Sequence, residues 1–272
     1  MERTALTVSP EKLVGELAAM LGDADPKSVV IAFDGDGTLW SGDVGEDLFR
    51  AAMRDGYLID AACPALIAEA ERYEVPLAAT GDANGIARTL LGAYLAGSYP
   101  ERDTCAMMTW CYAGRTLAEV ADFAASVLKE EDFETRLNRE VGPIIDWAKS
   151  QGIRLVLISA SPRVVIDAAG AAWGFGVADI AAATPAVEAG RVLPRMAAPV
   201  PYAEAKLSAG RALFGSARWL AAFGDNVFDI EMLQSAELGV AVRPKPKLEM
   251  ELAALGLRLL ARGAGASRPS AR

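Results

Sequence analysis

The chain has 272 residues, of which 52% are hydrophobic, and it carries a formal net charge of −9. The hydrophobic fraction excludes wholesale disorder, and the length suits a core domain that carries an insertion. The negative charge argues against nucleic acid as a partner, because contacts to phosphates need clustered Lys and Arg.

The sequence contains no histidine, which excludes Ser-His-Asp triads and zinc sites with histidine ligands. Acid–base chemistry near neutral pH therefore falls to carboxylates, Lys, Tyr or Cys. No run reaches about 18 apolar residues, so we expect no membrane span. The start, Met1-Glu2-Arg3-Thr4, shows no signal peptide, and the three cysteines include no Cys-x-x-Cys pair. We expect a cytoplasmic protein with reduced thiols.

The apolar pattern predicts strands that alternate with helices. An amphipathic helix over 9–21 has Ser9 as its N-cap, and a β-branched apolar run predicts a strand over 29–33. Further strands are predicted at 153–158, near 178–184, at 219–223 and at 238–242, with a hairpin around 188–191. Helices are predicted between them at 140–151, 163–173, 203–214 and 227–236. This alternation predicts an α/β fold with a Rossmann-like parallel sheet and helices on both faces.

A long helical stretch interrupts the alternation after the strand 29–33. Its helices are predicted at 45–54, 60–74, 84–96, 103–112 and 117–128. We interpret this stretch as an inserted all-helical cap domain over the carboxyl edge of the sheet. The predicted domains are a discontinuous catalytic core over 1–44 and 141–261, the cap over 45–140, and a flexible tail over 262–272.

Four carboxylates follow two of the predicted strands. Asp34 and Asp36 lie in the run Asp-Gly-Asp-Gly-Thr directly after the strand 29–33, and Asp225 and Asp229 follow the strand 219–223. Ligands in such sheets bind beyond the carboxyl ends of the strands, so we expect these side chains to meet at one edge. Hard oxygen ligands of this kind suit Mg²⁺, which takes its remaining ligands from water and substrate phosphate.

Two further residues are suited to holding a phosphate. Ser159 follows the strand 153–158 and precedes a predicted helix N-terminus, which favours anions. Lys206 offers a point charge to both Asp34 and a phosphoryl oxygen. A carboxylate nucleophile, a second carboxyl group, a metal and a cationic holder suffice for phosphoryl transfer through an aspartyl-phosphate. Enhancements approaching ~10²¹-fold for phosphate-monoester hydrolysis explain why so many groups are needed.

This set of motifs resembles the haloacid dehalogenase superfamily. The four motifs of that family match in order: Asp34-x-Asp36-x-Thr38, Ser159 after an apolar strand, Lys206, and Gly224-Asp225-x-x-x-Asp229. The resemblance covers about 28–40 and 140–250 and implies a family-typical core with a cap.

The resemblance also implies the roles of the site residues. It implies Asp34 as the nucleophile and Asp36 as the general acid and base. The implied phosphate and substrate binders are Thr38, Ser159, Ala160 and Lys206, and the implied Mg²⁺ ligands are Asp34, Asp36 (through its backbone), Asp225 and Asp229. The carboxylate of Asp36 favours a phosphatase over the dehalogenases of the family, which lack an acid there.

Within the superfamily the chain resembles the phosphoserine-phosphatase-like branch, which has a helical cap. Where that branch has a glutamate seven residues after the second Asp, this chain has Asp43, with Glu46 as an alternative reader of a substrate amine. Where that branch has an asparagine just before the last motif Asp, this chain has Phe228, with Asn226 as a potential substitute. Aromatic residues on amphipathic helices are usually core residues, so an aromatic box for a quaternary amine is the less favoured interpretation of Tyr94, Trp110 and Tyr112.

We therefore expect a Mg²⁺-dependent phosphomonoesterase that acts on a small phosphorylated metabolite, with a phosphoserine-like substrate as the leading hypothesis. One alternative is a phosphotransferase or mutase of the same superfamily. The other is a catalytically inactive regulatory protein that binds phosphate or metal. Nucleic acid and membranes are not expected as partners, and the sequence does not predict the oligomeric state.

Overall fold

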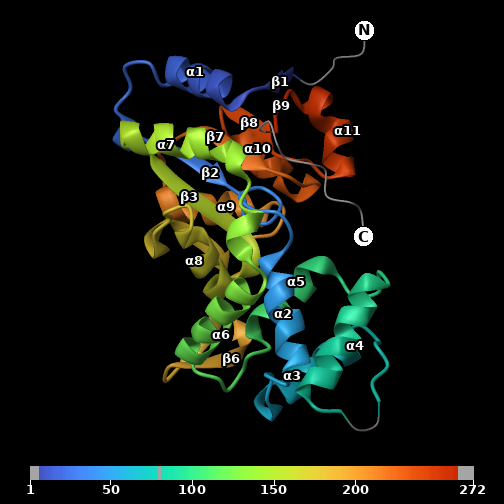
Figure 1. Cartoon of the computed structure of the whole chain (residues 1–272). Helices are drawn as coiled ribbons and strands as arrows, with labels where there is room; N and C mark the ends of the chain where they lie inside the picture. Colours follow the sequence, from blue (N-terminus) through green and yellow to red (C-terminus); the bar gives the residue numbers. More distant parts are fainter. Residues whose placement is uncertain (1–5, 79–80, 263–272) are drawn as a thin grey trace. The chain divides into compact units, whose positions relative to one another are not determined.

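The computed structural model describes residues 6–78 and 81–262 of the chain. The predicted tail over 262–272 lies outside the described residues, apart from Arg262. The chain forms two compact units. Figure 1 labels their helices and strands and colours the chain by residue number. The core unit comprises residues 1–42, 136–158 and 206–272, and the insert unit comprises residues 43–135 and 159–205.

A seven-stranded sheet forms the centre of the fold, with the strand order β1-β9-β8-β7-β2-β3-β4. The pairs β1–β9, β9–β8, β8–β7, β7–β2 and β2–β3 are all parallel. After Ile158 the strand β3 continues into the insert unit, which also contains β4. The strands are β1 Leu6–Val8, β2 Val29–Phe33, β3 Arg154–Pro162, β4 Ile180–Ala183, β7 Arg218–Gly224, β8 Leu238–Ala241 and β9 Arg258–Leu260.

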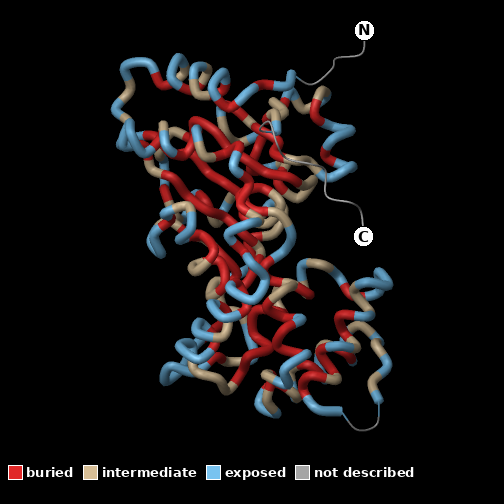
Figure 2. The backbone as a smooth tube through the Cα atoms, viewed as in Figure 1, coloured by how far each residue is buried: buried red, intermediate tan, exposed pale blue. Residues whose placement is uncertain are grey.

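The strand β2 is the buried centre of the core unit. All five of its residues are buried, and buried residues are red in Figure 2. Phe33, its last residue, pairs with Phe223 of β7 on one side and with Leu157 of β3 on the other. The rings of Phe33 and Phe223 stack with their centroids 4.5 Å apart. Strands β2 and β7 therefore end at the same level, and the residues that follow them start from one edge.

Helices cover both faces of the core sheet. The connections β1–α1–β2 and β2–α7–β3 run in one direction across the sheet, whereas β7–α10–β8 and β8–α11–β9 run in the other. Because such crossovers are right-handed, α1 and α7 lie on one face, where they pack together, and α10 and α11 lie on the opposite face. The core helices are α1 Pro10–Leu21, α7 Gly142–Gln151, α9 Ala205–Phe214, α10 Ile230–Ser235 and α11 Pro246–Leu255, with 3₁₀ turns at η1 Pro26–Ser28, η4 Arg139–Val141 and η6 Val227–Asp229.

The insert unit is helical between residues 43 and 135, in agreement with the predicted helices. Its helices are α2 Val44–Arg54, α3 Cys63–Arg72, α4 Ala83–Leu95, α5 Glu101–Trp110, α6 Leu117–Glu130 and α8 Arg163–Ala171, with 3₁₀ turns at η2 Asp60–Ala62, η3 Phe133–Arg136 and η5 Val177–Asp179. The predicted hairpin is confirmed as β5 Pro185–Glu188 and β6 Arg191–Met196. No helix in the described part of the chain is long and apolar enough to span a membrane.

The packed units and the predicted domains divide the chain at different places. Residues 45–135 of the predicted cap lie in the insert unit, but so do residues 159–205, which belong to the predicted core. The reason lies in packing, because α8 contacts α2 and α6 of the insert unit. The assignment of functional domains stays a prediction.

Several elements differ from the predicted ones. The predicted strand over 153–158 ends earlier than β3, which runs to Pro162. The helix predicted over 227–236 is divided into η6 and α10, and the sequence pattern does not predict β1, α11 and β9. The strands β1 and β9 have only three residues each and pair with one another from opposite ends of the chain. Strands this short give no readable periodicity.

The close packing of α10 and β8 gives a test of the core. A Cβ atom at Gly239 of β8 would lie 2.5 Å from Leu257 Cδ2 and 2.7 Å from Leu233 O, and the backbone carbonyl cannot move away freely. We expect Gly239→Ala to lower the free energy of unfolding by about 1–3 kcal/mol, which denaturant titration measures. The control Gly15→Ala adds a methyl group in open space on α1 and should stabilise by up to about 1 kcal/mol. Equal effects of the two substitutions would contradict this packing.

Candidate active site

A buried lysine joins two carboxylates at the carboxyl edge of the core sheet. The Nζ atom of Lys206 lies 2.5 Å from Asp34 Oδ1 and 2.5 Å from Asp229 Oδ1. The exposed fractions of the three side chains are 6% for Lys206, 8% for Asp34 and 1% for Asp229. A buried ion pair that loses one partner leaves an uncompensated charge, so the three groups depend on one another.

The fold explains why these groups meet. Asp34 directly follows β2, and its backbone N–H donates to Phe223 O at 2.9 Å, which continues the ladder between β2 and β7. Asp225 directly follows β7 on the neighbouring strand, and Asp229 closes the η6 turn. Lys206 lies in the first turn of α9. The structure therefore brings together Asp34, Lys206, Asp225 and Asp229.

Asp229 also orients the loop that carries Asp225. Its Oδ2 atom accepts hydrogen bonds from the backbone N–H groups of Asp225, at 3.1 Å, and of Asn226, at 2.9 Å. Its other oxygen is bound to Lys206. One carboxylate thus connects the lysine to the backbone of the loop Asp225–Asp229. This loop and the loop Asp34–Thr38 are the two carboxylate loops of the site.

The loop Asp34–Thr38 needs a glycine at position 37. Gly37 has a φ of +85°, and a Cβ atom there would overlap Oδ2 of Asp225. Thr38 is buried, and its Oγ1 donates to Asp34 Oδ2 at 3.2 Å. The loop therefore approaches Asp225 closely while Thr38 and Lys206 hold both oxygens of Asp34.

Burial shifts the ionisation of this cluster. Burial raises the pKa of Asp34 to about 7, although the positive charge of Lys206 opposes it. Burial, followed by the charge of Asp34, raises the pKa of Asp225 to about 8, with Lys245 opposing. Burial alone would lower the pKa of Lys206, but the charges of Asp229 and Asp34 outweigh it and raise that pKa. The carboxylates lack enough positive charge, and a cation would supply it.

The donor set fits Mg²⁺. One carboxylate oxygen from each of Asp34, Asp225 and Asp229 lies within 4.8 Å of the others. Oxygen donors of this type are those that Mg²⁺ prefers, and the missing side chain at Gly37 lets the loop Asp34–Thr38 lie close to Asp225. Asp36 is not part of this side-chain group, and its Oδ1 accepts a hydrogen bond from Trp40 Nε1 at 2.8 Å. Its predicted backbone contact to a metal stays a prediction.

The other predicted site residues belong to the insert unit. Ser159 and Ala160 lie within β3, and the buried Ser159 accepts a hydrogen bond from the backbone N–H of Ser161 at 3.1 Å. Asp43 is the N-cap of α2, where it accepts from the backbone N–H of Glu46 at 2.8 Å. The roles of these four predicted residues in substrate binding stay predictions.

Asp43 and Glu46 line a small acidic cavity of about 30 Å³. The other lining residues are Leu91, Tyr94, Glu101, Thr104, Cys105 and Met108. Burial, followed by the charge of Glu101, raises the pKa of the Tyr94 hydroxyl to about 12. Trp110 and Tyr112 do not line this cavity and are buried, so the structure contains them as core residues, as expected. Glu46 already forms an ion pair with Arg50, so the wall of this cavity carries less net negative charge than its three carboxylates alone would give.

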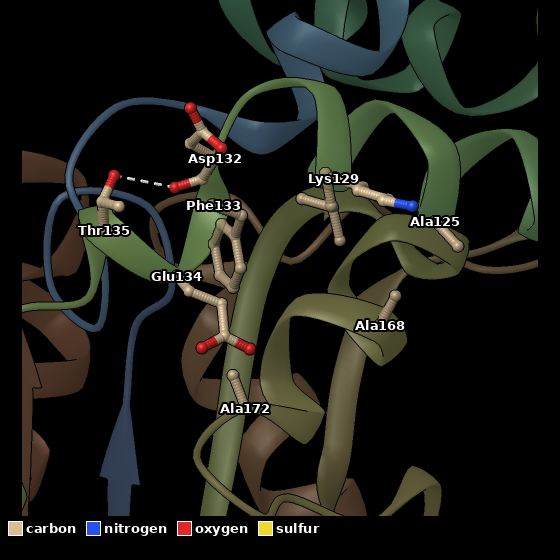
Figure 3. Close-up of a pocket in the computed structure, with 9 residues that line it drawn as sticks. Ala125, Lys129, Asp132, Phe133, Glu134, Thr135, Ala168 and Ala172 are labelled. Atoms are coloured by element: carbon tan, nitrogen blue, oxygen red, sulfur yellow. Dashed lines mark hydrogen bonds between the residues drawn. The ribbon is translucent and has the colours of Figure 1, made fainter.

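A larger pocket of about 460 Å³ lies between α6, η3 and α8 of the insert unit (Figure 3). Its wall is mostly apolar and includes Phe133, Ala125, Ala168 and Ala172. Thr135 Oγ1 donates to the carbonyl of Asp132 at 2.8 Å and fixes the turn at one end of the pocket. None of the predicted site residues lines this pocket, so we assign it no part in phosphate chemistry.

Sequence reasoning missed several polar residues next to the carboxylate loops. Lys245 Nζ lies 3.5 Å from Asp225 Oδ2, and Glu140 and Arg243 form a largely buried ion pair. Asn138 is buried and donates hydrogen bonds to backbone carbonyl groups of the loop Asp34–Thr38. In the sequence Glu140 is no more than the start of a predicted helix, because a contact to a residue 103 positions away leaves no local pattern.

The raised pKa of Asp225 predicts how stability depends on pH. Its folded-state pKa lies above the ordinary value of 3.8, so the metal-free folded protein keeps a proton that the unfolded chain releases. The contribution of Asp225 to the stability of the metal-free protein therefore falls as the pH rises from about 4 to about 8, by up to about 1.4 kcal/mol for each pH unit in that range. We expect Asp225→Asn to raise the thermal midpoint in EDTA at pH 8 and to have little effect at pH 4. Mg²⁺ should stabilise the wild type at pH 8 and not the variant. A variant less stable than the wild type at pH 8 would contradict the raised pKa.

Comparisons with known proteins identify the family of the chain and show its fold in solved structures. The family model described as haloacid dehalogenase-like hydrolase matches residues 31–234, and no curated protein matches the chain. The chain is similar in structure to a protein of unknown function from Bordetella pertussis Tohama I, with a TM-score of 0.68 and 18% identity over 87% of this chain and 100% of that chain.

Two further solved structures share the fold. One is an HAD family hydrolase from Salmonella enterica serovar Typhi, with a TM-score of 0.55 and 16% identity over 93% of this chain and 77% of that chain. The other is a substrate-bound phosphoserine phosphatase complex, with a TM-score of 0.50 and 15% identity over 86% of this chain and 93% of that chain. The family match spans most of the chain and includes Asp34, Lys206 and Asp225, and the chain belongs to the haloacid dehalogenase-like hydrolases.

Proposed function

We propose that the protein is a Mg²⁺-dependent phosphomonoesterase that forms an aspartyl-phosphate on Asp34. The observation that carries this proposal is the buried contact of Lys206 with Asp34 and Asp229, beside a third carboxylate, Asp225. A lysine in this position neutralises part of the cluster and offers a positive charge to an incoming phosphoryl group. Mg²⁺ held by Asp34, Asp225 and Asp229 would stabilise the charge that develops on the phosphoryl oxygens.

The side chains of the core unit supply the steps of the reaction. Asp34 attacks phosphorus and forms a P–O bond while the bond to the alcohol oxygen breaks, and Asp36 gives its proton to that oxygen. Asp36 then takes a proton from the water that attacks the phosphorus of the aspartyl-phosphate, which releases phosphate and restores Asp34. The hydrogen bond from Trp40 Nε1 fixes the orientation of the Asp36 carboxyl group within the loop Asp34–Thr38.

The intact set of acids also bears on the alternatives. A regulatory protein that only binds phosphate has no need for Asp36, and a buried triad of acids is costly to keep without a reaction that uses it. A phosphotransferase would use the same core residues, and the acceptor of the phosphoryl group distinguishes it. Measuring free phosphate against transfer to added alcohols therefore separates hydrolysis from transfer.

For the substrate, we propose a small phosphomonoester that carries an amine, with phosphoserine-like compounds first. The cavity wall includes Asp43 and Glu101, whose negative charge favours an ammonium group, and it includes Glu46, which is already bound to Arg50. One of the structural neighbours is a phosphoserine phosphatase, which agrees with this class. We also propose that the insert unit serves as a cap that selects the alcohol part of the substrate, and that the protein acts in the cytoplasm.

Removing the nucleophile tests the proposed reaction. With Mg²⁺, the wild type should release phosphate from at least one member of a panel of phosphoserine, phosphoethanolamine, phosphocholine and sugar phosphates. Asp34→Asn should lower kcat by at least about 10³-fold, because the amide does not attack phosphorus. Chelation of Mg²⁺ should abolish the activity of the wild type. Full activity of Asp34→Asn would exclude Asp34 as the nucleophile, and a silent panel would favour the regulatory alternative.

Substitution of Asp43, the charged N-cap residue of α2, tests the proposed substrate class. Asp43→Asn keeps an N-cap side chain on α2 but removes the negative charge. We expect the KM for amine-bearing phosphomonoesters to rise about 10-fold, since a lost bond to a charged group costs about 1.5–3 kcal/mol, and the KM for sugar phosphates to stay constant. The matched control is Asp82→Asn, which alters the N-cap of α4 and should change neither KM. Equal effects on both substrate classes would exclude Asp43 as the amine reader.

A further inference from the structure

The chain leaves the core unit at Gly42 and returns at Arg136, and the two crossing segments lie side by side. The backbone N–H of Ser41 donates to Arg136 O at 2.9 Å, and Arg136 Nε donates to Ser41 O at 2.8 Å. Trp40 and Leu137 form an antiparallel bridge next to this pair. The returning segment, residues 136–141, therefore runs directly along the end of the loop Asp34–Thr38. This loop carries the proposed nucleophile and is called the nucleophile loop below.

Asn138 in this segment donates hydrogen bonds to the backbone of the nucleophile loop and of Leu39, which follows it. Its Nδ2 atom donates to Gly37 O and to Thr38 O, both at 2.9 Å, and its backbone N–H donates to Leu39 O at 3.0 Å. The side chain is fully buried. Both side-chain partners are carbonyl oxygens, so the amide nitrogen must face them. Its Oδ1 atom accepts no hydrogen bond within the described residues, which indicates that the amide is present for its donors.

Two residues further on, Glu140 reaches the other carboxylate loop through an arginine. Its carboxylate, 2% exposed, binds Arg243 in a bidentate ion pair with Nε–Oε1 at 2.5 Å and Nη2–Oε2 at 2.9 Å. Arg243 has a φ of +44°, a backbone conformation that residues other than glycine rarely adopt. The bidentate ion pair holds the side chain of this unusual residue in one position.

The residues around Arg243 bind the backbone at Asp225. The N–H of Val242 donates to Gly224 O at 2.9 Å, and the N–H of Lys245 donates to Asp225 O at 2.7 Å. Arg243 lies between these two hydrogen bonds. Glu140 therefore fixes the loop after β8, and that loop fixes the backbone that carries the carboxylate of Asp225.

We propose that Asn138 and Glu140 are positioning residues that set the separation of Asp34 and Asp225 for binding Mg²⁺ and for phosphoryl transfer. Neither residue touches the carboxylates themselves, and each acts on one of the two loops from a single segment. That segment is also the point at which the chain returns from the insertion. The catalytic part of this inference rests on the proposed function, whereas the part on metal binding does not.

The chain offers matched controls for both residues. Asn84 is also a buried asparagine that binds the backbone, with hydrogen bonds of 3.0 and 3.1 Å to Leu58, but it lies in the insert unit. Arg218 and Glu237 form a second bidentate ion pair, at 2.6 Å for both contacts, and Arg218 is the first residue of β7, at the opposite end of that strand from Asp225. A merely structural role would make each residue behave like its control.

The experiment compares Asn138→Ala with Asn84→Ala and Glu140→Asp with Glu237→Asp, none of which changes the net charge. Three quantities are measured: the Kd of Mg²⁺ by calorimetry without substrate, the thermal midpoint in EDTA, and kcat and KM with p-nitrophenyl phosphate. Asn138→Ser, which keeps one donor, serves as a milder variant if the alanine variant does not fold. It should lie between the wild type and Asn138→Ala in every quantity that alanine changes.

We expect Asn138→Ala and Glu140→Asp to weaken Mg²⁺ binding about 10-fold or more and to lower kcat about 10- to 100-fold, with KM changed less than about threefold. The controls should lower the thermal midpoint but leave the Kd and kcat within about twofold of the wild type. Site variants that keep the wild-type Kd for Mg²⁺, as their controls do, would overturn the inference. A wild-type protein without any phosphatase activity would overturn the proposed function instead, and the Kd values would still decide the inference.

Discussion

The charge balance around Lys206 is the constraint on which the rest of the structure depends. Three buried carboxylates lie within 4.8 Å of one another, and Lys206 is the buried cation that contacts two of them. The third, Asp225, forms its ion pair with Lys245, whose side chain is largely exposed. Burial therefore raises the pKa values of Asp34 and Asp225 towards and above neutrality. A cluster with too little positive charge around it favours the binding of a divalent cation. The same shortage of positive charge lowers the stability of the folded protein when no cation is bound.

The core fold holds this balance in place. Strands β2 and β7 end at the same level because Phe33 pairs with Phe223, and the two carboxylate loops begin there. The close approach of the loops needs the missing side chain of Gly37, and Asp229 connects the lysine to the backbone of the second loop. The same edge also receives the segment through which the chain returns from its insertion. The geometry of the acids is thus over-determined, as a site that must hold repelling charges requires.

The sequence is sufficient for features that depend on local pattern and on sheet topology. The strand 29–33 is predicted with its observed bounds, and Asp34, Asp225 and Asp229 meet at one edge because parallel strands bring their carboxyl ends together. Lys206 joins them from the first turn of α9. The contact between Glu140 and Arg243 is not predictable in this way, because the two residues are 103 positions apart and neither belongs to a recognisable motif. The extent of the insert unit cannot be predicted from the sequence pattern, because it depends on the tertiary packing of α8 against α2 and α6. The role of Asn138 depends on two carbonyl groups that no sequence pattern marks.

The proposed reaction depends on transfer of the phosphoryl group to Asp34. Borohydride reduction of the enzyme, quenched during turnover of p-nitrophenyl phosphate, followed by peptide mass spectrometry, tests it most directly. An aspartyl-phosphate is an activated acyl group that borohydride reduces, whereas a free carboxylate is not reduced. Homoserine is expected at position 34, formed only when substrate and Mg²⁺ are both present. Active enzyme that yields an unmodified residue 34, or a reduced residue at another acid such as Asp36 or Asp225, would contradict it.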